Sequence, residues 1–73
     1  MNLLVLGGSG GVGRWLTRFA ADGGHAVTAL VRPSASLDVP PTVRVVRGDV
    51  LDPSVLAAVV EGQNAVASCL GLR

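Results

Sequence analysis

The glycine-rich stretch from Gly7 to Gly13 constrains the fold of this chain more than any other feature of the sequence. It places five glycines in seven residues, directly after the continuous apolar run from Leu3 to Leu6. Such a run is typical of a strand buried on both faces of a parallel sheet. Glycine permits a sharp turn with positive φ and lets phosphates approach bare N–H groups, next to the partial positive charge of a helix N-terminus. The stretch therefore predicts a strand, a phosphate-binding turn and a helix.

The glycines satisfy two overlapping templates, GxxGxxG from Gly7 and GxGxxG from Gly8. A glycine pattern alone is weak evidence, and a flexible loop is the alternative. The context favours a nucleotide site, because a second strand ends close to the ~20 residues further on that such a unit requires. We predict that the turn binds a diphosphate through Gly7, Ser9, Gly10, Gly11, Val12 and Gly13.

The helix after the turn is predicted to end at Asp22, where Gly23 and Gly24 can supply a left-handed cap. Its apolar residues recur at helical spacing and are expected to pack on the sheet, with Arg14, Thr17 and Arg18 on the other side. The expected packing residues are Val12, Trp15, Leu16, Phe19 and Ala20.

The rest of the chain predicts three more strands and one more helix. The strands are 26–31, 43–46 and 65–70. Arg44 and Arg47 interleave with the valines of the 43–46 strand and suit a strand at the lateral edge of the sheet. Residues 34–41 are expected to form a loop, with one helical turn at 35–38 as an alternative. Asp52 and Pro53 begin the second helix, which Gly62 ends. Its sheet-facing residues are expected to be Val55, Leu56, Val59 and Val60.

This succession, β-α-β-β-α-β, predicts a truncated α/β Rossmann-like half. With right-handed crossovers the parallel sheet takes the order 3-2-1-4, with one helix on each face. At 73 residues the chain is short for this architecture, so we expect a partial NAD(P)-binding domain over residues 1–73.

Composition narrows the function classes. The chain is 49% hydrophobic and 15% charged with a net charge of +1, which indicates a packed core. Its six basic residues are dispersed arginines, so nucleic acid is not an expected partner. No apolar run approaches the ~18 residues of a membrane span, and we expect a cytoplasmic location. Because lysine and tyrosine are absent, the chain holds neither a P-loop nor a Lys- or Tyr-based proton relay.

Residues that follow the predicted strands indicate which dinucleotide would bind. Arg32 stands where an NAD-preferring site places an acid, and a guanidinium suits a 2′-phosphate, so NADP is favoured over NAD. A solvated arginine at a loop entrance is the alternative. Asp49 with Val50 is a candidate adenine contact, with a plain turn as its rival, and Leu70 with Gly71 would let backbone approach a ribose. The sequence offers no catalytic set and no metal-ligand cluster.

In these residues the chain resembles the NAD(P)H-binding, NmrA-like and biliverdin-reductase-B-like atypical members of the short-chain dehydrogenase/reductase superfamily. The resemblance rests on four short motifs in the correct order, at 7–13, 24–32, 48–53 and 62–66. It implies an NADP(H) site in which Gly7, Gly10 and Gly13 admit the pyrophosphate, Arg32 meets the 2′-phosphate, and Asp49 with Val50 borders the adenine.

The resemblance also implies that catalysis lies outside this chain, because family members continue through further strands that hold nicotinamide and substrate. We therefore expect the cofactor-binding segment of an NADP-dependent oxidoreductase, inactive by itself. The alternatives are a non-catalytic NAD(P)-sensing or binding module, and a fragment with no retained ligand binding that covers its fourth strand by self-association or by a missing C-terminal half.

Overall fold

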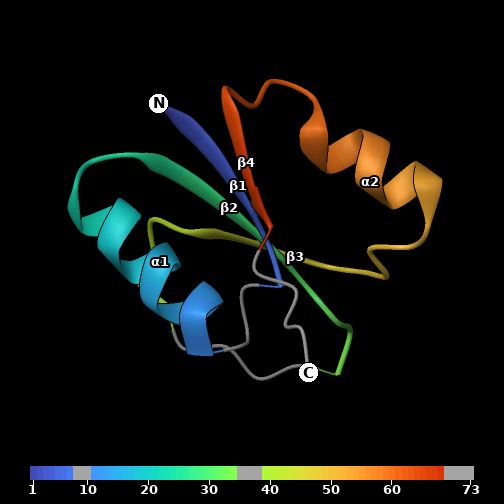
Figure 1. Ribbon diagram of the computed structural model, residues 1–73, viewed down its shortest axis with the longest axis horizontal. Helices are drawn as coiled ribbons and strands as arrows, with labels where there is room; N and C mark the ends of the chain where they lie inside the picture. Colours follow the sequence, from blue (N-terminus) through green and yellow to red (C-terminus); the bar gives the residue numbers. More distant parts are fainter. Residues whose placement is uncertain (8–10, 35–38, 69–73) are drawn as a thin grey trace.

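Four parallel strands form one sheet, and a helix lies on each side of it (Figure 1). The computed structural model describes residues 1–7, 11–34 and 39–68. The sheet has the order β3-β2-β1-β4, which confirms the predicted α/β Rossmann-like topology. The elements are β1 (Asn2–Leu6), α1 (Gly11–Asp22), β2 (Ala26–Val31), β3 (Arg44–Arg47), α2 (Pro53–Val60) and β4 (Ala65–Ser68). The helical turn considered at 35–38 and the predicted strand residues beyond Ser68 lie outside the described residues.

The central strands divide the core into two layers because successive side chains of a strand point to opposite faces. Leu4 and Val5 of β1 are both fully buried, Val5 in the layer under α1 and Leu4 in the layer under α2. The α1 layer also contains Ala20, Val27, Ala29 and Val43, and the α2 layer contains Leu30 and Val59. This two-sided burial explains why the β1 sequence is continuously apolar.

Helix α1 is rotated away from its predicted orientation. Its buried residues are Gly13, Thr17 and Ala20, and Leu16 is half-buried. Trp15 and Phe19, predicted to pack on the sheet, expose 63% and 64% of their surface, and Val12 exposes 71%. The prediction for these three residues was wrong. The physical reason is size: residues 13, 17 and 20 form a stripe of small side chains along one helix face, which lets α1 lie close to the sheet.

Helix α2 begins where predicted. Asp52 Oδ1 accepts hydrogen bonds from Ser54 N at 3.0 Å and from Ser54 Oγ at 2.7 Å, and Pro53 occupies the first turn. Val59 is buried, while Val55 and Leu56 are half-buried against the same layer. Val60 is 42% exposed, so its predicted place against the sheet was wrong. It lies about 100° around the helix from Val59, which takes the central position.

Both helices end at a glycine with positive φ. After α1, Gly24 has φ 86°, and its N–H and that of His25 donate to the carbonyls of Ala21 and Ala20, each at 3.1 Å. This is a Schellman cap, as the two glycines predicted. After α2, Gly62 has φ 80° and Gln63 N donates to Val60 O at 3.1 Å, closing a type II turn that requires glycine at its third position.

Candidate functional site

The carboxyl ends of β1, β2 and β3 form one edge of the sheet and bring three predicted binding segments together. The N–H of Gly7, after β1, donates to Leu30 O of β2 at 3.1 Å. The N–H of Gly48, after β3, donates to Val31 O at 2.9 Å. Arg32 follows Val31 directly, so Gly7, Arg32 and Asp49 belong to adjacent strand ends, where ligands bind in sheets of this kind.

In the described part of the glycine-rich turn, the backbone has the conformation that the sequence predicts. Gly7 has φ 77°, a left-handed conformation that favours glycine. Gly11 begins α1, and among the described residues nothing lies within 4 Å of the position that a Cβ would take there. The first N–H groups of α1 have no intrahelical acceptor and can bind an anion. Val12 is exposed beside them, and Ser9 and Gly10 lie outside the described residues.

Gly13 places the first turn of α1 close to the sheet, since it is one of the buried residues of that helix. The fully buried Thr17 donates its Oγ1 hydrogen bond to Gly13 O at 2.7 Å. Sequence reasoning missed Thr17 by assigning it to the solvent side. The sequence signal that could have found Thr17 is its i, i+4 spacing from Gly13, a second small residue on the same helix face. The bond lies within α1 and satisfies a hydroxyl that packing on the sheet removes from solvent.

Arg32 stands at the carboxyl end of β2 with an exposed side chain. It is the first residue after the strand and precedes the exposed Pro33. A guanidinium has five N–H donors, and the exposed side chain of Arg32 carries them at the carboxyl end of β2. The structure thus places Arg32 at the strand end where the sequence predicted it.

Asp49 has a local structural partner. Its Oδ1 accepts from Leu51 N at 2.9 Å, and its main-chain carbonyl accepts from Asp52 N at 3.0 Å. These bonds form the turn from β3 into α2, the rival role considered for Asp49. Val50 is half-buried against the α2 layer. One carboxylate oxygen of the exposed Asp49 is not engaged by that turn, so the turn role leaves an acceptor available.

Asp52, which precedes the first turn of α2, is a hydrogen-bonded carboxylate. The hydroxyl and the N–H of Ser54 both donate to Asp52 and hold the pKa of its carboxyl below the ordinary value. Within residues 1–7, 11–34 and 39–68, no three histidine, cysteine, aspartate or glutamate side chains gather as a metal site. In the same part of the chain, neither helix has the length and apolar character needed to cross a membrane. Leu70 and Gly71, the candidate ribose contacts, lie outside these residues.

Comparison of the sequence with known families agrees with a dinucleotide site at these strand ends. The profile of the NAD(P)H-binding family matches residues 7–73. The chain belongs to this family. Its place there confirms the resemblance drawn from the motifs at the level of NAD(P)H binding, and it supports a nicotinamide dinucleotide as the class of cofactor.

Relatives of this NAD(P)H-binding chain are much longer. It is 38% identical over 64 residues to a Mycobacterium tuberculosis protein named 3 beta-hydroxysteroid dehydrogenase/Delta 5-->4-isomerase, covering 88% of this chain and 17% of that protein. It is 34% identical over 79 residues to an isoflavone reductase homolog from Zea mays, covering 94% of this chain and 26% of that protein. The chain thus spans about a quarter or less of these relatives.

A solved structure agrees with the fold. A Rossmann-fold NAD(P)-binding family protein from Shigella flexneri superposes with a TM-score of 0.84 at 28% identity, over 99% of this chain and 38% of that one. The similarity covers the whole sheet and both helices described here. It confirms that the β3-β2-β1-β4 arrangement is that of a Rossmann fold.

Proposed function

We propose that this chain binds NADP(H) in preference to NAD(H), as the cofactor-binding segment of an oxidoreductase. The observation that carries the cofactor preference is the position of Arg32, exposed at the end of β2 next to the glycine turn that follows β1. An acid at this position would accept from the ribose 2′-hydroxyl of NAD, whereas a guanidinium can grip a 2′-phosphate with two charge-assisted hydrogen bonds.

In this proposal the turn from Gly7 to Gly13 and the start of α1 hold the pyrophosphate. Gly7 supports it by its positive φ and Gly13 by its close approach to the sheet. The free oxygen of Asp49, with Val50, borders the adenine, and Leu70 with Gly71 approaches a ribose. Hydride chemistry belongs to the bound cofactor, and this segment fixes the adenosine end of it.

Calorimetric titration of the 73-residue protein tests the preference. NADP should bind at least about tenfold more tightly than NAD, since a charge-assisted bond contributes about 1.5–3 kcal/mol. Arg32→Glu should narrow or invert the difference. Arg18→Glu makes the same change of charge on the exposed surface of α1 and should leave the ratio intact. Equal affinities of the parent for NADP and NAD would refute the assignment.

A dinucleotide-sensing or binding module without catalysis, as in NmrA-like regulators, is the second candidate. It needs the same adenosine site, so the sequence by itself does not separate it from the first candidate. NADPH oxidation by the longest natural form of the chain separates the two. Turnover with a carbonyl or double-bond substrate supports the oxidoreductase, and tight binding without turnover supports the module.

Self-association is the third candidate, favoured by the apolar side chains that α1 leaves exposed. Val12, Trp15 and Phe19 lie in solvent, and β4 borders the sheet on its second edge with Val66 half exposed. We propose that a second copy covers these side chains when the 73-residue form is free. Sedimentation velocity of the NADP-free protein over a range of protein concentrations tests this association. A monomer at every concentration would contradict it.

A further inference from the structure

Arg47, the last residue of β3, contacts the main chain just beyond Arg32. The pairing of β3 with β2 sets Arg47 opposite Val31, the last residue of β2. The Nη1 of Arg47 also donates to the carbonyl of Pro33 at 3.5 Å. Arg32 is the single residue between these two partners, so Arg47 adjoins the chain on both sides of it.

Strand pairing holds the main chain of β2 only as far as Val31. Its carbonyl accepts from Gly48 N at 2.9 Å, and the exposed Arg32 and Pro33 follow outside the strand. A side chain on an unrestrained loop loses orientational freedom when it binds a ligand, and this loss weakens binding. The Arg47 bond restrains the loop at Pro33. At 3.5 Å it is a long hydrogen bond, which suits a role in orienting the loop rather than in stabilising the fold.

Both arginines lie at the carboxyl edge of the sheet, where the candidate dinucleotide site is. Arg47 shares a face of β3 with Val45, which packs against the α1 layer, so Arg47 lies on the α1 side of the sheet. Two exposed arginines at adjacent strand ends raise the positive potential there. A phosphomonoester carries a charge of about −1.5 to −2 at pH 7, and this edge therefore favours such a group.

We propose that Arg47 is a positioning residue for recognition of the 2′-phosphate. Its bond to the Pro33 carbonyl holds the loop so that the guanidinium of Arg32 is oriented before the phosphate arrives. This inference rests on the proposed preference for NADP(H) and deepens it. Arg32 is the phosphate ligand, and Arg47 acts through it. The effect is confined to ligands with a 2′-phosphate, because the rest of the adenosine makes no demand on Arg32.

Two probes that differ only in the 2′-phosphate test this role, adenosine 2′,5′-bisphosphate and adenosine 5′-monophosphate. Calorimetric titration of the 73-residue protein should show that Arg47→Met weakens bisphosphate binding about three- to tenfold, the equivalent of ordering one long side chain. Binding of the monophosphate should stay as in the parent. The melting temperature should stay as well, because the Arg47 side chain is exposed.

A double-mutant cycle with Arg32→Met separates positioning from direct contact. If Arg47 acts through Arg32, Arg47→Met should change bisphosphate affinity less than about twofold in the Arg32→Met background. Losses that multiply in the double variant would show that Arg47 meets the phosphate independently, and they would overturn the positioning role.

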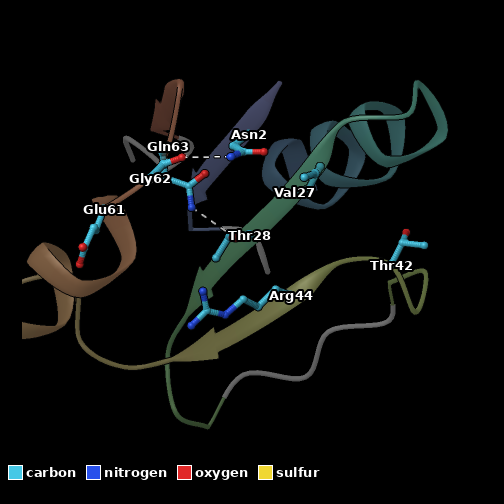
Figure 2. A pocket seen from close by; sticks show the side chains of 9 residues that line it. Asn2, Val27, Thr28, Thr42, Arg44, Glu61, Gly62 and Gln63 are labelled. Atoms are coloured by element: carbon cyan, nitrogen blue, oxygen red, sulfur yellow. Dashed lines mark hydrogen bonds between the residues drawn. The ribbon is translucent and has the colours of Figure 1, made fainter.

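Arg44 provides the matched control on the same strand. It lies three residues before Arg47, at the amino end of β3 and on the opposite face of the sheet. There it lines a pocket of about 360 Å³ together with Asn2, Thr28 and Gln63 (Figure 2). Arg44→Met makes the same change of charge far from the carboxyl edge and should leave the affinity for both probes unchanged.

The outcomes distinguish this inference from the proposed function on which it rests. An Arg47→Met protein that binds the bisphosphate like the parent, while Arg32→Met weakens it, refutes the role of Arg47 and leaves the NADP preference standing. An Arg44→Met protein that loses as much affinity as Arg47→Met would show an effect of net charge alone and would also refute that role. Equal affinities of the parent for the two probes would refute the NADP preference itself, and the role of Arg47 with it.

Discussion

Trp15 stacks on Phe19 along the outer surface of α1, with ring centroids 5.1 Å apart and planes 19° from parallel. The two rings touch each other rather than the core, since each exposes nearly two thirds of its surface. Their contribution to the fold is therefore limited to the pair itself, about 0.5–1.5 kcal/mol beyond area burial.

Replacing both aromatic residues should change association more than stability. Trp15→Gln/Phe19→Gln should lower the free energy of unfolding by no more than about 1.5 kcal/mol, because little more than the stack is lost. Concentration-dependent association should decline in sedimentation velocity. Leu16→Gln is the control, since it buries an amide in the α1 layer and should cost about 2 kcal/mol or more in urea unfolding. A double variant as unstable as Leu16→Gln would contradict the observed rotation of α1.

Gly48→Ala should destabilise the protein through a single contact. A Cβ at Gly48 would lie 2.9 Å from Cγ1 of Val55, and the β-branched valine has little rotamer freedom in a helix. Overpacking of this kind costs about 1–3 kcal/mol. The matching test is a double-mutant cycle by urea unfolding, in which Val55→Ala makes room. If Gly48→Ala costs the same in the Val55→Ala background, the strain lies elsewhere.

Gly24→Ala should destabilise by backbone conformation alone. Gly24 has φ 86° and open space around its missing side chain, so the expected cost is the left-handed penalty of about 1–2 kcal/mol. Asn, which tolerates this conformation, should cost less. Gly23→Ala is the neighbouring control: its φ is not positive, its nearest atom is Ala20 O at 3.4 Å, and its melting temperature should match or exceed the parent's. Equal losses at both glycines would contradict the cap.

Asp52 should give the fold a measurable loss of stability in acid. Hydrogen bonds from Ser54 lower the pKa of this carboxyl in the folded state, so its contribution is present above the pKa of the unfolded chain and is lost as pH falls through the folded pKa. Asp52→Asn keeps an acceptor for Ser54 but does not titrate. Between pH 7 and pH 3, urea unfolding should show a smaller loss for Asp52→Asn than for the parent. Asp22→Asn, in the last turn of α1, removes one carboxylate at a different position and serves as the control for the change in net charge.

The topology was predictable because its signals are local and agree with each other. The apolar run before Gly7, the glycines after Asp22 and the Asp52-Pro53 pair each mark one element boundary, and all three are observed. Right-handed crossovers then leave one natural strand order. Likewise, Gly7 and Arg32 fall at neighbouring strand ends because parallel strands end at the same edge.

The pocket at the amino ends could not be read in advance. Arg44 appeared only as an edge-strand charge, and Gln63 only as part of a short motif after the second helix. They line one cavity because β3 pairs with β2 in a register that sets Arg44 beside Thr28, while the Gln63 amide reaches the same threonine. Gln63 and Thr28 are 35 positions apart in the sequence, so no local pattern links them.

The sequence by itself determined the backbone at Gly7 and the helix caps, since each depends on conformations that few residues allow. The element order then determined the order of the strands, because crossovers are right-handed. Only the tertiary structure decided which face of α1 meets the sheet. Hydrophobicity pointed to Trp15 and Phe19, but close packing of a helix on a sheet selects small side chains, and Gly13, Thr17 and Ala20 supply them.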